Sequence, residues 1–261
     1  MIKGLYTSAA GMLPLSFRQD LVTNNLSNAN TAGYKQDRAF IHDLVTADLY
    51  LNEHGVASSG QPPRSINVYP PAYTASVGNS SLVVVEQTDF TQGEMDITGN
   101  DFNIAIDGDG FFTIQTPQGI RYTRNGYFSI GQDGDLVTAE GYTVLGAGGP
   151  INVQGGKLTV QGNGDIYVNN EPRGTLRIDD FPKPYKMTKI GDNLFTAEGG
   201  GAGKTSENFK VRQGMLEKAN AHPVDQLVKM IEIQRMFELG QRAIRMQDET
   251  LQQVITQVGR V

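Results

Sequence analysis

The chain has neither cysteine nor tryptophan among its 261 residues. Without cysteine it can form no disulfide, no thiolate zinc site and no thiol nucleophile. The three histidines, at positions 42, 54 and 222, are too widely spaced to suggest a metal site. No run of 18 apolar residues occurs, so we expect no membrane insertion. These absences exclude several classes of enzyme and of transmembrane protein.

Positive charge is also scarce. The 22 lysines and arginines are outnumbered by 28 acidic residues, which gives a net charge of −6. No long basic run is present, so we expect no nucleic-acid partner. The first residues, MIKGLYTSAAGML, contain no sustained apolar core and no clear cleavage site. We therefore expect no cleaved signal peptide.

Glycine is abundant, with 31 residues, and it punctuates the middle of the chain. Between residues 86 and 210, short apolar-alternating runs are separated by turn sequences such as DGDG, PQG, GQDG and GNG. Turn signals that recur roughly every 8–12 residues are typical of an all-β sandwich or barrel. The residues with a period of two, expected to face a core, are Ile104 and Ile106, Phe112 and Ile114, Leu158 and Val160, and Ile166 and Val168.

Residues 1–45 contain an amphipathic helical pattern. Leu5, Met12, Gln19 and Leu26 recur every seven residues, with further apolar side chains between them. Pro14 interrupts this pattern, because a proline inside a helix removes one backbone hydrogen bond and clashes with the preceding turn. We expect either a kink at Pro14 or a helix that begins there.

Residues 211–261 predict a longer helix. Pro223 suits a first helical turn, and no proline follows it before Gly259. A helix over residues 223–258 is roughly 54 Å long at 1.5 Å per residue. The residues that follow helical spacing are Leu227, Met230, Gln234, Phe237, Gln241, Ile244, Asp248, Leu251, Ile255 and Val258.

The fold class predicted is thus mainly β, with an irregular all-β central domain and long terminal helices that pair into a coiled coil. Four parts are expected: an N-terminal helix with an Asn-rich turn (1–45), a variable connector (46–85), the β domain (86–210) and the C-terminal helix (211–261). An apolar helix face must be buried. Either the two helices pack on their own chain, or further copies pack around them.

The stretch NNLSNANTAGYK, residues 24–35, ends the first helix. Asparagine and serine side chains compete with helical hydrogen bonds, and Gly33 supplies the left-handed conformation that ends a helix. One interpretation is a simple helix terminus. The other is that Asn24, Asn25 and Asn28 also present amides at a packing surface.

This stretch, with the preceding GLYTSAAGM, resembles the N-terminal signature of bacterial flagellar rod, hook and hook-associated axial proteins. The motif positions present are Asn24, Asn25, Leu26, Asn28, Asn30, Thr31, Gly33, Tyr34 and Lys35. Residues 101–146 and 224–252 are similar to the β domain and C-terminal helix of the rod members. The length is similar to that of the proximal and distal rod proteins, and the ending ITQVGRV favours the proximal type. A hook-type paralogue is an alternative.

The resemblance implies a structural subunit of the basal-body rod that assembles head-to-tail into a helical tube, transmits torque and encloses the export channel. It implies export by the flagellar type III apparatus, a periplasmic location in the basal body, and contacts with other copies and neighbouring rod proteins. No catalytic, cofactor or metal residue is expected. The predicted assembly residues are Leu5, Met12, Asn24, Asn25, Leu26, Asn28, Asn30, Thr31, Gly33, Tyr34, Leu227, Met230, Phe237, Ile244, Leu251, Ile255 and Val258.

Two readings from other classes compete with this one. Paired acids in the turns, at Asp107, Asp109, Asp133 and Asp135, could bind calcium or serve glycoside hydrolysis. However, Asp-Gly is common hairpin chemistry, and no full EF-hand loop is present. A carbohydrate- or peptide-binding β module with helical ends is the second alternative.

Overall fold

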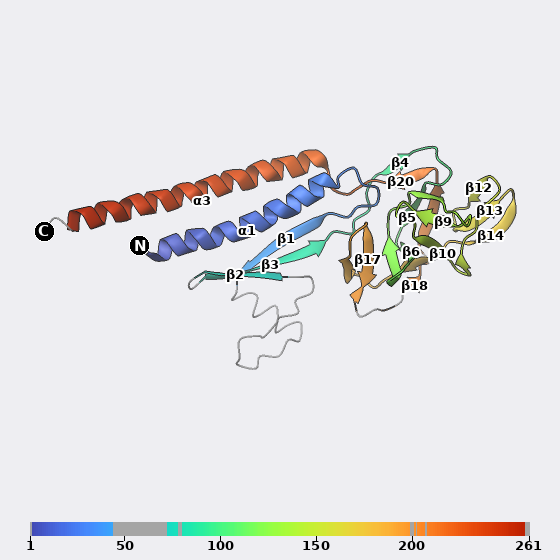
Figure 1. Ribbon diagram of the computed structural model, residues 1–261, viewed down its shortest axis with the longest axis horizontal. Helices are drawn as coiled ribbons and strands as arrows, with labels where there is room; N and C mark the ends of the chain where they lie inside the picture. Colours follow the sequence, from blue (N-terminus) through green and yellow to red (C-terminus); the bar gives the residue numbers. More distant parts are fainter. Residues whose placement is uncertain are drawn as a thin grey trace. The chain divides into compact units, whose positions relative to one another are not determined.

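The computed structural model describes residues 2–43, 72–77, 80–198, 201, 203–206 and 208–258. The described chain is mainly β, with one long helix near each end (Figure 1). The predicted class of a mainly β protein with terminal helices is therefore confirmed. Contacts between Cα atoms divide the chain into two compact units. Unit 1 takes its described residues from 1–27, 37–89 and 222–261, and unit 2 comprises those of 28–36 and 90–221.

Unit 1 consists of the two helices and a small antiparallel sheet. Helix α1 spans Ile2–Ser27 and helix α3 spans Pro223–Val258, as the sequence predicted for the second helix. The sheet has the order β1-β3-β2, with bounds Asp37–Asp43 for β1, Ala72–Val77 for β2 and Ser80–Thr88 for β3. Helix α1 contacts α3 and all three strands.

Helix α1 runs through Pro14 without a break. The expectation that the helix begins at Pro14 is therefore wrong. Pro14 is buried, so its ring contributes to packing, which offsets the loss of one backbone hydrogen bond. Most of the predicted connector, residues 46–85, lies outside the described residues, apart from β2 and the first part of β3. In the described part of the chain, no helix combines the length and the apolar character needed to cross a bilayer.

Unit 2 is built from short antiparallel strands. Its largest sheet has the order β16-β17-β7-β6-β10-β9-β8, and β15 pairs with both β6 and β18 while β11 pairs with β10. Three smaller groups complete the unit: β12-β13-β14, β19-β5 and β20-β4. The bounds are Met95–Ile97 (β4), Ile104–Gly108 (β5), Phe111–Thr116 (β6), Gly119–Thr123 (β7), Phe128–Ile130 (β8), Leu136–Thr138 (β9), Thr143–Gly146 (β10), Gly149–Pro150 (β11), Leu158–Val160 (β12), Asp165–Val168 (β13), Glu171–Thr175 (β14), Ile178–Asp180 (β15), Met187–Lys189 (β16), Leu194–Ala197 (β17), Lys204–Thr205 (β18), Phe209–Gln213 (β19) and Met215–Glu217 (β20).

The main core of unit 2 is aliphatic. It gathers the inward-facing side chains of several strands, because successive residues of a strand point to opposite faces. All four period-two pairs predicted from the sequence, from Ile104 and Ile106 to Ile166 and Val168, are buried in this single cluster. That part of the sequence prediction is confirmed.

A second, aromatic cluster covers the other face of β6. Phe111 points into it, whereas the next residue, Phe112, points into the aliphatic core. Phe90, Tyr185 and Phe195 pack around Phe111, with ring centroids 5.4–6.0 Å from it. The edge-to-face arrangement of Phe90 and Tyr185 on Phe111 is the one that aromatic quadrupoles favour.

The hydroxyl of Tyr185 donates a hydrogen bond of 3.0 Å to the Asp180 carboxylate. Burial of the ring, followed by this bond to a carboxylate, raises the pKa of Tyr185 well above its ordinary value of 10. An acid whose pKa is higher in the folded state stabilises the fold while it is protonated. Its contribution is complete below pH 10 and is lost as the pH rises towards the folded-state value.

We predict that Tyr185 ionises later than ordinary tyrosines in an alkaline titration followed by phenolate absorbance. The absence of tryptophan makes this signal easy to read. Tyr185→Phe should remove one late-titrating group. The control Tyr127→Phe, at a side chain that is 49% exposed, should leave the late phase in place. An unchanged late phase in Tyr185→Phe would contradict the assignment.

Candidate assembly surface

Helices α1 and α3 contact each other within unit 1. The two chain termini lie at the same end of the pair, so the helices are antiparallel (Figure 1). Gly240 on α3 lies against Met12, and a Cβ atom built at Gly240 would be 3.2 Å from Met12 Cγ. The glycine thus makes room for a larger side chain on the facing helix.

The face of α3 turned towards α1 follows alternating spacings of three and four residues, as in a coiled-coil seam. Gln226 and Ile233 are each only 1% exposed, and Gly240 and Gln247 are half-buried at the same heptad position. The other position of the seam contains Met230, Phe237, Ile244 and Leu251, all half-buried.

One row of this seam differs from the sequence prediction. The sequence pattern placed Gln234, Gln241 and Asp248 between the apolar residues, but all three are exposed. The buried row lies one residue earlier, and it holds Ile233 and Gly240 as well as two amides, Gln226 and Gln247. Leu227 and Ile255, from the same predicted row, are 47% and 68% exposed.

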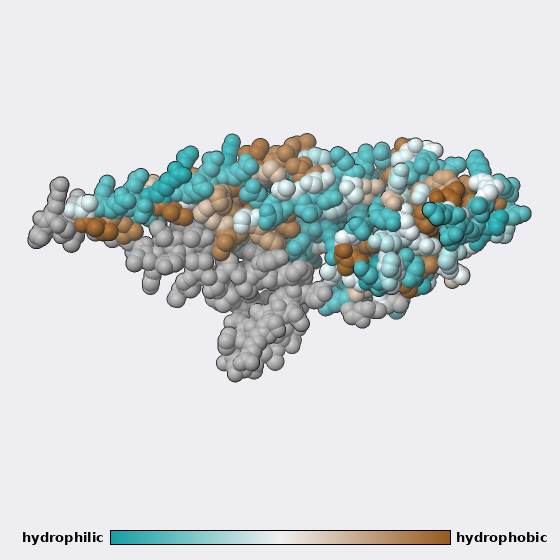
Figure 2. Space-filling view, in the orientation of Figure 1, coloured by the Kyte–Doolittle hydropathy of each residue, from teal (hydrophilic) through white to brown (hydrophobic). Residues whose placement is uncertain are grey.

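A second apolar stripe on α3 is exposed. Figure 2 shows hydrophobic atoms gathered over the N-terminal half of this helix. The side chains that form this stripe, here called the outer stripe, are between 47% and 70% exposed, and at 3.6 residues per turn they fall on one side of the helix. They are Val224, Leu227, Val228, Ile231, Leu239 and Met246.

The far end of α3 extends beyond α1. Met12 lies opposite Gly240, and the first residue of α1, Ile2, lies ten residues before Met12. Because the helices are antiparallel, Ile2 lies level with the residue ten positions after Gly240, which is Thr250. The remaining residues up to Val258 therefore lie past the end of α1, over roughly 12 Å at 1.5 Å per residue. Leu251 is half-buried there and Ile255 is exposed.

The predicted N-terminal residues occupy several environments. Met12 and Leu26 are half-buried, Asn24 and Asn30 are exposed, and Asn28 and Thr31 are half-buried. The side chains of Leu5 and Val258 lie outside the described residues, although both backbones belong to helices.

Asn25 is 2% exposed and closes the end of α1 onto the first strand. Its amide nitrogen donates to the Asp37 carbonyl at 2.8 Å, and its amide oxygen accepts from the Asp37 backbone N–H at 3.0 Å. This side chain therefore acts like a strand neighbour of Asp37. Of the two interpretations of the asparagines, Asn25 fits an internal structural role.

The turn after Asn28 is packed tightly within unit 2. Gly33 has a φ of 67°, and a Cβ built there would lie 2.4 Å from the backbone of Arg124 and Asn125. Tyr34 is 6% exposed and packs against Ala219 and Ala221. Only glycine satisfies both the dihedral angle and the close approach at position 33.

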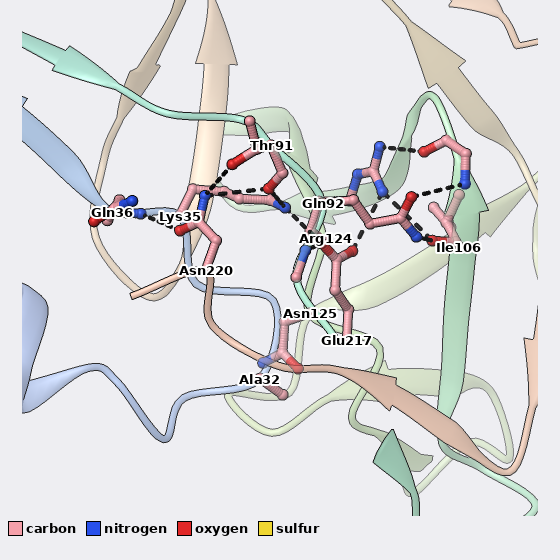
Figure 3. A network of polar contacts seen from close by, with 12 residues as sticks. Ala32, Lys35, Gln36, Thr91, Gln92, Ile106, Arg124, Asn125, Glu217 and Asn220 are labelled. Carbon is pink, nitrogen blue, oxygen red and sulfur yellow. Dashed lines mark hydrogen bonds and ion pairs between the residues drawn. The ribbon is translucent and has the colours of Figure 1, made fainter. Parts of the chain in front are cut away.

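Lys35, the last residue of the motif, is buried in a polar network (Figure 3). Its ammonium donates to Glu217 Oε1 at 2.5 Å and to the Thr91 carbonyl at 2.7 Å. Arg124 donates to Glu217 Oε2 at 3.2 Å and to the Gly108 carbonyl at 2.8 Å. The Glu217 side chain is fully buried, so these cations compensate a charge that water cannot reach.

The acidic turns are engaged in local contacts. Asp107 pairs with Arg212 at 3.1 Å, Asp109 pairs with Lys183 at 2.6 Å, and Asp135 accepts from the Asn152 amide at 3.0 Å. Among the described residues, no group of three or more acidic, histidine or cysteine side chains is placed to hold a metal ion.

Sequence reasoning did not identify Arg124, Glu217, Ile233 or Gly240 as important residues. Glu217 is 182 positions from Lys35, so no local pattern could connect them. Ile233 and Gly240 are seven residues apart, which is the spacing of a coiled-coil row. The sequence could not distinguish this row from the neighbouring one, which holds Gln234 and Gln241, because both have the same spacing.

Comparisons with known proteins cover most of these elements. The family described as "Flagella basal body rod protein" matches residues 5–35, which hold α1 and the Asn-rich turn. The "Flagellar hook protein FlgE/F/G D1 domain" matches residues 105–168, and the "Flagellar basal body rod FlgEFG protein C-terminal" family matches residues 212–257.

Whole-chain similarity agrees with these matches. The chain is 35% identical to the flagellar basal-body rod protein FlgG of Borreliella burgdorferi, over 96% of this chain and 97% of that protein. It is 31% identical to FlgF of Caulobacter vibrioides over the full length of both. FlgG of Bacillus subtilis is 29% identical over 98% of each chain.

The chain belongs to the flagellar basal-body rod protein family. Because relatives named FlgG and relatives named FlgF both match, the choice of the proximal rod type stays a prediction. Within this rod protein, the family matches at residues 5–35 and 212–257 include both helices and the motif that holds Lys35.

Two isoleucines of α3 test which face of this helix is buried in the rod protein. Ile233→Ala should lower the free energy of unfolding by about 2–5 kcal/mol, because it leaves a cavity against α1. Ile231→Ala has the same effect on helix propensity, but its side chain is 51% exposed and little should be lost. Chemical denaturation of the dilute protein measures both, and equal losses would contradict the described facing of α3.

A second prediction concerns the glycine of the motif. Gly33→Ala and Gly99→Ala both place a Cβ at a left-handed residue, with φ values of 67° and 70°. A Cβ at Gly99 meets nothing within 4 Å, whereas a Cβ at Gly33 collides with backbone. We expect Gly33→Ala to cost about 1–3 kcal/mol more than its control, in the range of overpacked sites. Equal thermal stabilities of the two variants would show that the turn does not dock as described.

Proposed function

We propose that this chain is a self-assembling subunit of the flagellar rod, in which terminal helices of successive copies pack head-to-tail into a helical tube. The tube encloses the export channel and transmits torque. Membership of the rod family supports a structural role in the basal body and no enzymatic one. The observation that supports assembly through the helices is the outer stripe of α3.

Exposed apolar side chains gathered on one side of a helix favour a protein–protein contact, even where Arg235 and Arg242 stand between them. The outer stripe includes three β-branched residues and three longer ones, and its exposed fractions reach 70% at Val224. At 3.6 residues per turn its members lie on the side of α3 opposite the seam that faces α1. We propose that α1 and α3 pair as a coiled coil within one copy, and that the outer stripe forms a second seam with another copy.

The geometry of such a contact favours a filament over a closed dimer. In this proposal one face of α3 belongs to the helix pair of its own chain, and the opposite face meets a different surface on a neighbour. A contact between two unlike surfaces is heterologous, and it builds a helical filament when the rotation does not close. The part of α3 beyond α1, which carries Leu251 and Ile255, would extend the contact along the axis.

The predicted assembly residues divide between these two seams. Met12, Leu26, Met230, Phe237 and Ile244 would hold the helix pair together, and Leu227, Leu251 and Ile255 would meet neighbours directly. The residues of the turn, from Asn28 to Tyr34, would act indirectly, since they pack on unit 2 of their own chain. The four-part domain division at residues 45, 85 and 210 also stays a prediction.

The remaining parts of the proposal rest on the family. They are export by the type III apparatus without a cleaved signal, a periplasmic rod location, and contacts with neighbouring rod proteins. A carbohydrate- or peptide-binding β module is the alternative from another class. It would keep its ligand when self-association is abolished, whereas the rod proposal ties function to assembly.

The test replaces three side chains of the outer stripe together: Val228→Ser, Ile231→Ser and Leu239→Ser. These side chains are exposed, so the monomer should keep its fold, while sedimentation at rising concentration should show that assembly is lost. Cells that carry only this variant should not swim.

The matched control removes three exposed isoleucines of unit 2: Ile97→Ser, Ile120→Ser and Ile130→Ser, which are 76%, 39% and 44% exposed. It should assemble and support swimming. Normal assembly of the α3 variant, or loss of assembly in the control alone, would contradict the proposed role of the helices.

A further inference from the structure

Residues 28–36 come from the N-terminal part of the chain, yet they belong to unit 2. Their backbone bonds to the last segment of that unit. The Gly33 N–H donates to the Glu217 carbonyl at 2.6 Å, the Asn220 N–H donates to the Tyr34 carbonyl at 3.3 Å, and the Gln36 N–H donates to the Asn220 side chain at 2.7 Å. Two segments almost 200 residues apart are therefore joined like neighbouring strands.

Side chains of unit 2 hold the same segment from a second direction. Asn193 donates to the Ala32 carbonyl at 2.8 Å. The ammonium of Lys189 donates to the Lys35 carbonyl at 2.5 Å and lies 4.3 Å from the centre of the Tyr34 ring. Residues 28–36 are thus held by backbone and side-chain hydrogen bonds to unit 2 rather than lying loosely on its surface.

The buried charge of Glu217 makes docking of residues 28–36 an all-or-none event. Glu217 accepts from Lys35, from Arg124 and from the Gly93 N–H, which lies 2.9 Å from Oε1. If residues 28–36 leave, Glu217 loses one of two cations in a site that is fully buried. Removing one partner of a buried ion pair costs about 3–5 kcal/mol. The carboxylate therefore favours either a fully docked segment or a disrupted site.

The docked segments adjoin both helices in the sequence. Ser27, the last residue of α1, immediately precedes the docked segment, and Pro223, the first residue of α3, follows Ala221 by two positions. Bringing together two helices this far apart in sequence has an entropic cost of loop closure. A docked segment removes that cost by raising the effective concentration of one helix near the other.

We infer that residues 28–36 and 217–221 form a latch whose closure sets the pairing of α1 with α3. The latch needs both segments, so α1 and α3 of a full-length chain stay largely unpaired while residues 28–36 are undocked. Pairing of the helices, and with it the presentation of the outer stripe to other copies, thus follows docking of this segment. Only this last consequence rests on the proposed rod function.

The absence of cysteine permits a direct test in the full-length chain. Met12→Cys with Gly240→Cys places two thiols where the helices touch. The effective molarity of this pair, measured by disulfide exchange with glutathione, reports how often α1 and α3 are paired. Hydrogen exchange of residues 28–36 reports in the same samples whether the latch is closed.

Lys35→Met removes the ammonium and retains most of the stem. We expect loss of protection in residues 28–36, and a fall in effective molarity of roughly tenfold or more. Asn193→Gly, which retains the left-handed conformation and removes one donor to the segment, should shift both readouts less and in the same direction. The milder variant keeps the test valid if Lys35→Met fails to fold.

Two controls separate the latch from general destabilisation. Lys183→Met removes an ion pair of similar length, 2.6 Å to Asp109, at an exposed site in the same unit. Val168→Ala weakens the aliphatic core of unit 2 without touching the latch. Both should leave the effective molarity unchanged. Three results would overturn the latch. The first is loss of hydrogen-exchange protection in residues 28–36 with an unchanged effective molarity, and the second is full protection of these residues in Lys35→Met. The third is a fall in effective molarity in either control as large as that in Lys35→Met.

Assembly gives a separate readout. If the latch acts through helix pairing, a preformed disulfide between positions 12 and 240 should restore assembly to the Lys35→Met chain. Failure of the bridged chain with intact Lys35 to assemble would contradict the rod proposal and leave the latch standing. Suppose that the disulfide-bridged chain assembles when it retains Lys35 but does not assemble when it carries Lys35→Met. That result would overturn the claim that the latch acts through pairing of the helices.

Discussion

The buried carboxylate of Glu217 is the point on which the arrangement of both chain ends depends. It lies on the last strand of unit 2, and it is compensated by Lys35 from the N-terminal segment and by Arg124 from the middle of the chain. A buried charge is tolerated only when its partners are present. Three distant parts of the sequence must therefore meet before unit 2 is complete, which makes its folding non-local.

The pairing of the two helices depends on that constraint. Each leaves unit 2 within two residues of the docked segments, and their pairing uses small and apolar side chains such as Gly240, Met12 and Ile233. Burying one face of α3 still leaves the outer stripe in water. A helix with one apolar face packed on α1 and apolar side chains exposed on another face favours association, because burial of the exposed side chains requires a further surface.

Local patterns were sufficient to predict much of this fold. Period-two residues such as Ile104 and Ile166 identified the core of unit 2, and Pro223 marked the start of α3, because both signals depend on neighbouring residues alone. The sequence left two outcomes open at Pro14, a kinked helix or a helix that begins there, and local patterns could not choose between them because tertiary packing can offset one lost hydrogen bond. The Lys35–Glu217 pair could not be predicted, because nothing in either local sequence identifies a partner 182 positions away.

The chemistry of the latch fits the proposed export of the chain before it folds. An apolar replacement of a buried ion pair is often as stable or more stable, so stability alone does not explain a lysine and a glutamate here. When the latch is open, Lys35 is solvated and Glu217 retains Arg124 as its remaining cation. When it is closed, each requires the other, so mismatched docking is penalised. The charged pair therefore confers specificity on the folded state, whereas in the proposed assembly the outer stripe of α3 would supply the affinity between copies.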